Sequence, residues 1–146
     1  MAFVLTGYTR LDRPHREIER CIRDLAEAFR ARDLSAARGQ ACLLVEKLGE
    51  HFADEEEMMR AAAWPHLVHH AECHAHLLFQ VRRFERHIAV NPLTPDIASW
   101  AMKRLPELIR YHVMATDFGF AKHAVRVSHD PRPRLARRRE SPVRRG

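Results

Sequence analysis

The stretch HFADEEEMMRAAAWPHLVHHAECH, which runs from His51 to His74, combines five histidines and several carboxylates with the apolar content of a helix. Its apolar residues recur at helical rather than alternating spacing, which favours helix over strand. The Trp64-Pro65 pair divides the stretch, because proline cannot continue the backbone hydrogen bonding of a helix. The sequence therefore predicts that one helix ends here and another begins, and that both carry side chains able to bind metal.

Four amphipathic helices are predicted along the chain. They run from about Asp12 through Phe29, from Asp33 or Ser35 to about Ala63, from about His66 to His87, and from Pro95 to about Ala124. We expect Asp12 to cap the first helix, with Pro14 in its opening turn, and Thr94 to cap the fourth. Short connections between long amphipathic helices predict an all-α, antiparallel up-down-up-down four-helix bundle.

The chain of 146 residues is long enough for one domain with a buried core. Its net charge of +6 belongs to the C-terminal end, because residues 125–146 hold eight arginines and two acidic residues, whereas residues 1–124 hold 17 basic and 17 acidic ones. We therefore expect a neutral bundle in residues 1–124 and a basic, largely disordered tail in residues 125–146. The tail is either a solvated extension or a segment that contacts a polyanion, anionic lipid or acidic partner.

The expected localisation rests on the apolar runs and the cysteines. No stretch approaches the length of a membrane span, and residues 2–5 are too short for the core of a signal peptide. Cys21, Cys42 and Cys73 are odd in number and form no Cys-x-x-Cys pair, which favours free thiols in a reducing compartment. We expect a soluble, cytoplasmic protein, and a monomer.

Two pairs of residues have the spacing of metal ligands. His51 and Glu55 lie four residues apart in the second predicted helix, and His70 and His74 lie four apart in the third, so each pair shares a helix face. Both pairs neighbour the apolar stripe of their helix. A histidine in that position is either a packed core residue or a ligand, so a single pair is a weak indication.

The first and fourth helices add further ligand types. His15 precedes the apolar stripe of the first helix, and His112 lies in the fourth with Asp117 five residues on. Five residues correspond to about 140° around an ideal helix, so His112 and Asp117 are not expected to approach one ion in parallel. A carboxylate that reaches sideways between two ions fits this spacing. Ligand types from all four helices together are a strong indication of a metal site.

The motifs around these residues resemble the hemerythrin family, in particular its single-domain bacterial members. The matching stretches are LDRPHREIE around His15, HFADEEEMM with His51 and Glu55, WPHLVHHAECH ending in His70 and His74, and LIRYHVMATDFGF with His112 and Asp117. The resemblance covers roughly residues 3–124. It implies two non-haem iron ions (Fe²⁺/Fe³⁺) that are held by five histidines and bridged by two carboxylates and an oxo or hydroxo group, and all seven protein positions are filled.

The resemblance also implies how the ligands divide and what the site does. His70, His74 and His112 would saturate one iron, while His15 and His51 would leave one position open on the other. The implied function is reversible binding of O₂, with NO as another ligand, for oxygen storage, delivery or sensing. We expect no enzymatic activity, because the sequence offers no candidate acid near the open position. The alternative is a di-iron enzyme or sensor that handles peroxide or NO.

Apolar residues would line the O₂ pocket by the same resemblance. They are Ile18, Phe52, Leu108, Ile109 and Val113, although each is equally compatible with an ordinary core position. The family usually has tryptophan where this chain has Leu108. The smaller side chain predicts a wider pocket and faster autoxidation.

The remaining polar residues of the motifs are not expected to bind metal. Glu56 and Glu57 are expected to be solvated, with the alternative that one of them orients a ligand imidazole from outside the site. The histidines outside the motif pattern are His66, His69, His76, His87, His123 and His129.

Overall fold

The computed structural model describes residues 5–128, and this part of the chain is helical without a strand. Its elements are α1 (Thr9–Arg30), α2 (Leu34–Ala61), α3 (Leu67–Val90), α4 (Pro95–Ser99), η1 (Trp100–Arg104), α5 (Leu105–His112), η2 (Val113–Asp117) and α6 (Phe118–Ser128). The elements from α4 to α6 follow one another without a break and form one fourth helix, in which η1 and η2 are π-helical turns. The predicted all-helical bundle is confirmed for these residues.

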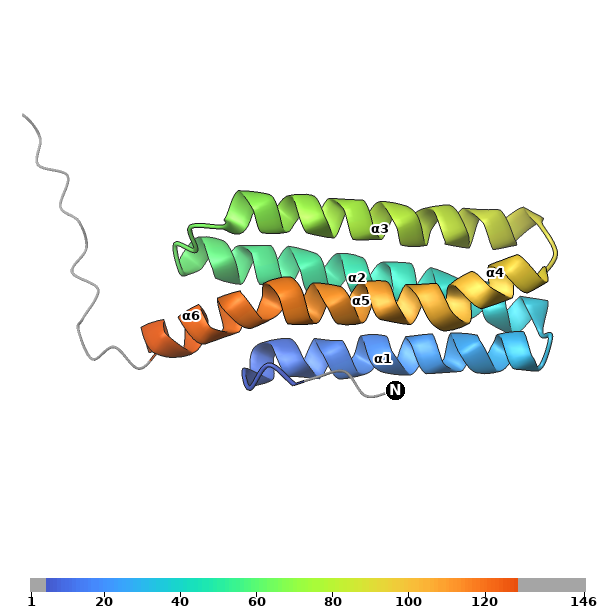
Figure 1. Cartoon of the computed structure of the whole chain (residues 1–146), viewed down its shortest axis with the longest axis horizontal. Helices are drawn as coiled ribbons and strands as arrows, with labels where there is room; N and C mark the ends of the chain where they lie inside the picture. Colours follow the sequence, from blue (N-terminus) through green and yellow to red (C-terminus); the bar gives the residue numbers. More distant parts are fainter. Residues whose placement is uncertain (1–4, 129–146) are drawn as a thin grey trace, which may run out of the picture.

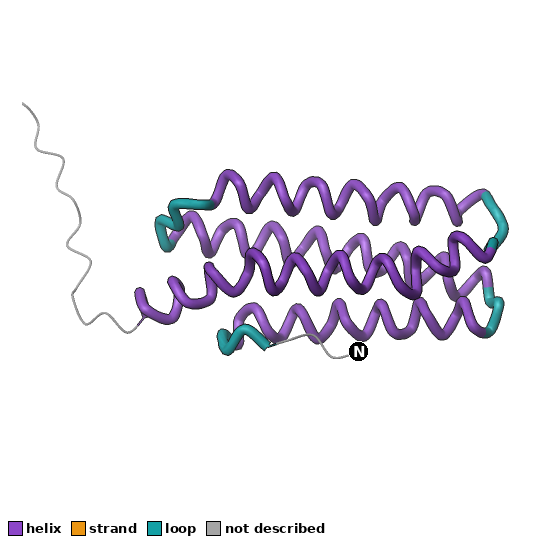
Figure 2. Tube along the Cα trace, viewed as in Figure 1, coloured by secondary structure: helices purple, strands orange, loops and turns teal. Residues whose placement is uncertain are grey.

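The four helices lie side by side along the long axis of the molecule (Figure 1). Short loops join successive helices, and these loops alternate between the two ends of the bundle (Figure 2). Each helix consequently passes the middle of the molecule once. Residues from all four helices can therefore meet there.

Two predicted helix starts are confirmed. The Asp33 side chain caps α2 by accepting a hydrogen bond from the Ala36 backbone N–H at 2.9 Å. The Thr94 hydroxyl accepts from the Ile97 N–H at 3.4 Å, and Pro95 occupies the first turn of the fourth helix. Both caps satisfy a backbone donor that has no partner inside its own helix.

The predicted start of the first helix is wrong. Helix α1 begins at Thr9, so Asp12 lies within its first turn rather than at its cap. The buried carboxylate of Asp12 instead accepts hydrogen bonds from the N–H and hydroxyl of Thr6, both at 2.7 Å, and from the N–H of Gly7 at 3.1 Å. The Gly7 backbone has a φ of 80°, which glycine adopts without steric cost. Asp12 therefore holds the segment that precedes the helix against it.

Other helix ends differ from the prediction by a few residues. Helix α2 ends at Ala61 because Ala63 adopts a left-handed φ of 51°, which lets the Trp64 N–H donate to the Met59 carbonyl at 2.9 Å. Helix α6 continues to Ser128, four residues past the predicted end. The rest of the predicted tail, from residue 129 on, lies outside the described residues, and its disorder stays a prediction.

Two observations concern the environment of the chain. The thiols of Cys21, Cys42 and Cys73 are unpaired, as predicted. Within residues 5–128, no helix has both the length and the apolar character needed to cross a membrane.

The buried apolar residues form two clusters. The larger includes Ile18, Phe52, Leu77 and Ile109, and the smaller is built from Leu11, Met59, Phe120, Ala121 and Ala124. On each helix, the predicted metal ligands fall in the sequence between a residue of the larger cluster and a residue packed in the smaller one. The polar centre of the bundle therefore has apolar packing on both sides.

Candidate metal centre

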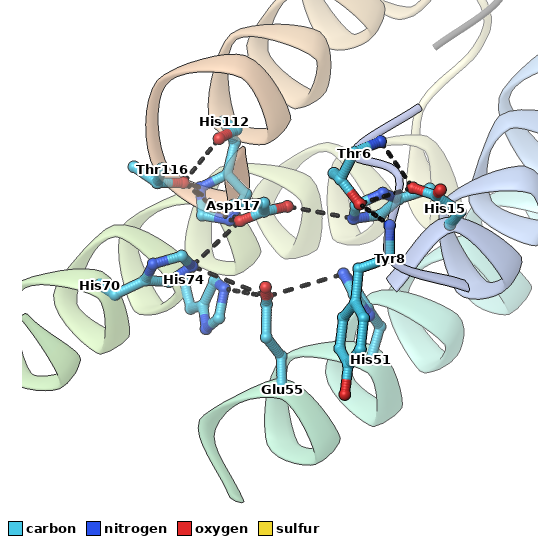
Figure 3. Close-up of polar contacts among 11 residues, drawn as sticks. Thr6, Tyr8, His15, His51, Glu55, His70, His74, His112, Thr116 and Asp117 are labelled. Carbon is cyan, nitrogen blue, oxygen red and sulfur yellow. Dashed lines mark hydrogen bonds and ion pairs between the residues drawn. The ribbon is translucent and has the colours of Figure 1, made fainter. Parts of the chain in front are cut away.

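The structure brings the seven predicted ligands together in the middle of the bundle (Figure 3). Each of the four helices contributes at least one of them, and all are at least 94% buried. They are His15 on α1, His51 and Glu55 on α2, His70 and His74 on α3, and His112 and Asp117 on the fourth helix.

One part of the cluster, which we term the three-histidine half, contains His70, His74 and His112 with both carboxylates. One ligand-type atom of each of these residues lies within 4.8 Å of those of the others. The three imidazole rings also contact one another, with centroids 4.5 to 5.2 Å apart. This arrangement surrounds a single point with nitrogen and oxygen atoms.

The other part, the two-histidine half, contains His15, His51 and Asp117. The two rings meet edge to face with their centroids 4.8 Å apart. This half has one imidazole fewer than its neighbour. A cation bound here would have fewer protein ligands than a cation in the three-histidine half.

The carboxylates lie between the two halves. Asp117 presents Oδ2 to Nε2 of His15 at 3.0 Å and Oδ1 to Nε2 of His70 at 3.0 Å. Glu55 Oε2 lies 3.1 Å from Nε2 of His74 and 3.8 Å from Nε2 of His51. In Figure 3 each carboxylate has histidines on both sides. Asp117 faces the two sides with different oxygens, as a carboxylate that bridges two ions would, whereas Glu55 faces both with Oε2.

The expected separation of His112 and Asp117 is wrong, and a π-helical turn is the reason. Residues Val113–Asp117 form η2, in which backbone hydrogen bonds span five residues rather than four. The wider turn returns residue i+5 toward the face of residue i, so His112 Nε2 lies 3.0 Å from Asp117 Oδ1. The two side chains therefore approach one point in parallel.

The donor set fits a metal ion. Buried atoms of the cluster, among them His15 Nε2, Glu55 Oε1 and Asp117 Oδ2, have no hydrogen-bond partner among the described residues. A buried polar atom without a partner costs about 1–3 kcal/mol. A cation placed between these lone pairs removes that cost, and imidazole with carboxylate suits several transition metals.

The pKa values in the metal-free cluster reflect two buried carboxylates surrounded by imidazoles. Burial raises the pKa of Asp117, but His112, His15 and His70 outweigh it and hold this pKa well below its usual value. Burial likewise opposes the lowering of the Glu55 pKa by its histidine neighbours. The cluster therefore keeps two negative charges in its interior.

One imidazole from each half, His51 and His70, responds differently to these charges. Burial lowers the pKa of His51 to about 4, because the nearby Glu55 charge only partly compensates for desolvation. Burial also acts on His70, but hydrogen bonding and charge from Asp117 and Glu55 raise its pKa to about 9. In the metal-free protein, His70 thus holds a proton at neutral pH, which a metal cation would displace.

Two residues outside the predicted ligand set contact the ligand imidazoles. Nδ1 of His74 donates to Oε1 of Glu56 at 2.8 Å. The Thr116 hydroxyl lies 3.2 Å from Nδ1 of His112 and 2.5 Å from its carbonyl oxygen, so it can accept from the ring while donating to the backbone. Glu56 matches the alternative of an orienting carboxylate. Thr116 was missed, although it lies four residues after His112 and so near the same face.

The residues expected to line an O₂ pocket do not all lie in one environment. Ile18, Phe52, Ile109 and Val113 are buried. Leu108 is half-buried and lines a cavity of about 430 Å³ between α3 and the fourth helix, together with Leu77, His112 and Thr116. The smaller side chain at Leu108 therefore adjoins an opening next to the three-histidine half.

The histidines expected not to bind metal lie outside both groups as far as the structure describes them. His66, His69, His76 and His87 are exposed, and His123 is half-buried with Nε2 3.0 Å from the Ala62 carbonyl oxygen. Residue 129 lies outside the described part.

Fold and site together define a helical-bundle protein with a buried cation-binding centre. A family model for the Hemerythrin HHE cation binding domain matches residues 6–124, a range that contains all seven candidate ligands. The chain belongs to the hemerythrin family. A comparison with curated proteins gives no match.

Proposed function

We propose that this protein binds two non-haem iron ions in its central cluster and uses them to bind O₂ reversibly, within an antiparallel up-down-up-down bundle. The observation that carries the proposal is the position of Asp117, which faces His70 with one oxygen and His15 with the other, each at 3.0 Å. A carboxylate with this placement bridges two ions rather than completing one. When bound, the iron pair with an oxo or hydroxo bridge supplies the electrons that make O₂ binding possible.

Iron is the metal that the donor set supports best in this family. Five imidazoles and two carboxylates are harder ligands than thiolates, and no cysteine belongs to either metal group in the described residues. Imidazole and carboxylate serve ferrous and ferric iron alike. This donor set therefore suits a site that must hold iron in both oxidation states.

The protein's own residues would divide the work between the halves. His70, His74 and His112 would saturate an ion in the three-histidine half, whereas His15 and His51 would leave an ion in the other half with fewer protein ligands. O₂ would therefore bind at the two-histidine half. The buried side chains of Ile18 and Val113 support the exclusion of bulk water, which protects the ions from oxidation.

We further propose that the protein is a carrier, store or sensor of O₂ rather than an enzyme. Among the described residues, Asp12 is the one buried charged side chain outside the seven candidate ligands. Its carboxylate is already occupied by Thr6 and Gly7. The described part of the chain therefore offers no further buried carboxylate or imidazole to transfer protons to a substrate, which a peroxide- or NO-consuming enzyme would need.

The unpaired cysteines support a cytoplasmic location, because thiols persist where the compartment is reducing. Such a compartment also supplies the electrons that keep an iron pair in its ferrous form. We propose that the protein acts there as a monomer.

The test is an optical spectrum of the anaerobically reduced, iron-loaded protein before and after air is admitted. We expect about two irons per chain and a visible charge-transfer band that appears with air and disappears when O₂ is removed. Stoichiometric zinc, or iron at one per chain, would contradict the di-iron proposal. Irreversible bleaching with turnover of peroxide or NO would instead favour the enzyme.

A further inference from the structure

Within residues 5–128, Glu56 is the side chain outside the candidate ligands that contacts one of them through a charged hydrogen bond. It lies on α2 and crosses to α3, where its Oε1 is 2.8 Å from Nδ1 of His74. Because a carboxylate only accepts, Nδ1 must carry the proton. With Nδ1 engaged by Glu56, the opposite nitrogen, Nε2, is the one that faces the centre of the bundle, 3.1 Å from Glu55 Oε2.

The ring of His74 is also held by packing. Phe52 stacks on it with ring centroids 4.0 Å apart and an interplanar angle of 9°. The stacking restricts tilt of the imidazole, while the hydrogen bond to Glu56 fixes which edge faces the centre of the bundle. His74 is thus oriented from two directions before any cation binds.

The adjacent glutamate provides a natural contrast. The side chain of Glu57 is 71% exposed and pairs on the surface with Arg60, whereas that of Glu56 is 28% exposed. The two residues are chemically identical and differ by one position on the same helix. Only one of them reaches the metal centre.

We infer that Glu56 is a positioning residue that fixes the tautomer of His74 and strengthens its hold on the cation of the three-histidine half. A carboxylate that accepts the Nδ1 proton makes the opposite nitrogen a better donor to a metal. The inference rests on the proposed metal centre and assigns Glu56 to one of its two halves. It predicts an effect at one site rather than at both.

Cobalt(II) binding to the full-length protein tests this inference without O₂ chemistry. Co²⁺ is titrated into metal-free wild type, Glu56→Gln, Glu56→Ala and the control Glu57→Gln, with visible absorption and a competing chelator to resolve two binding steps. Loss of an outer carboxylate typically weakens metal binding by about 10–100-fold. We expect that loss at one step in both Glu56 variants, with a shifted absorption band for that site, and wild-type behaviour in Glu57→Gln.

The possible outcomes separate the inference from the proposal beneath it. Wild-type protein that binds fewer than two Co²⁺ ions would overturn the two-metal centre itself. Two wild-type binding steps that are unchanged in Glu56→Gln and Glu56→Ala would overturn the role of Glu56 alone. Equal weakening of both steps without a band shift would indicate general destabilisation, which also overturns the positioning role.

Discussion

The two halves of the metal centre share Asp117 but are built differently. In the three-histidine half, His74 is oriented by Glu56 and His112 lies against Thr116. In the two-histidine half, both ring nitrogens of His15 are without a hydrogen-bond partner among the described residues. The three-histidine half therefore has more candidate ligands, and residues outside the ligand set orient two of its imidazoles. The two-histidine half has fewer candidate ligands, and its His15 ring has no such partner.

The surroundings of the halves differ as well. The three-histidine half adjoins the cavity of about 430 Å³ that Leu108 and His112 line. His51 of the two-histidine half lines a larger cavity of about 730 Å³, which is also bordered by Arg13 and Asp54. The charged residues in the wall of the larger cavity come from α1 and α2, whereas those of the smaller cavity, Glu72 and Arg104, come from α3 and the fourth helix.

Under the proposed function, this difference would let one protein hold a metal pair firmly and still leave a position for an external ligand. The three-histidine half would retain the pair through the shared Asp117. The two-histidine half, with fewer protein ligands, would leave room for ligand exchange. The following experiments change one half, both halves or neither.

Removal of a bridge should have the largest effect, because it weakens both halves at once. Glu55→Ala deprives the cluster of one of its two buried negative charges and of an oxygen close to His74 and His51. We expect the purified variant to lose most of its iron. Metal analysis against a Glu57→Ala control measures this, and iron near two per chain would show that Glu55 is not a bridge.

Loss of one histidine should separate the halves. His15→Ala leaves a single imidazole in the two-histidine half, so we expect about one metal ion per chain. His74→Ala leaves two imidazoles in the three-histidine half, which is the number that the two-histidine half has in the wild type. We therefore expect this variant to retain closer to two metal ions per chain. Both counts come from metal analysis after dialysis. The comparison between the halves would fail if both variants lost the same amount.

A substitution beside the smaller cavity should alter the lifetime of the oxygenated protein rather than its metal content. Leu108→Trp fills part of the 430 Å³ space if the ring fits without overpacking. If the exclusion of water raises the activation free energy of autoxidation by about 1 kcal/mol, the rate falls about fivefold. Decay of the absorbance of the oxygenated protein in air-saturated buffer provides the rate. Equal or faster decay in a folded, fully metallated variant would remove Leu108 from the control of water access.

Deletion of residues 129–146 should affect neither half. All seven candidate ligands and the end of α6 precede the cut. We expect the truncated protein to have unchanged iron content and O₂ binding, and a lower affinity for a polyanion such as heparin. In the full-length chain, any such affinity should weaken as the salt concentration rises. A truncated protein that cannot fold or bind iron would show that these residues contribute to the bundle.

Features repeated along one helix could be predicted from the sequence, because they depend on local geometry. The spacing of His70 and His74 places both on one face of the helix whatever the helix packs against. Asp33 and Thr94 cap their helices through hydrogen bonds to residues only three positions further along the chain. The location of the net charge is likewise a property of composition. The resemblance of the motifs then named the family.

Other features were decided by tertiary structure. Ideal α-helical geometry predicts that Asp117 lies about 140° around the helix from His112. The π-helical turn reduces this angle, and the sequence did not predict it because its backbone hydrogen bonding cannot be read from the spacing of side chains. Asp12 resembled a helix cap, yet it binds a segment that folds back against the helix.

The contact between Glu56 and His74 shows the limit most clearly. The sequence marked Glu55 and Glu56 as neighbouring carboxylates, but their roles diverge because α3 passes close enough for Glu56 to reach Nδ1 of His74. Distances between helices depend on how all their side chains pack together. The sequence by itself therefore determined which residues could share a helix face, and the packing of one helix against the next decided which of those residues meet.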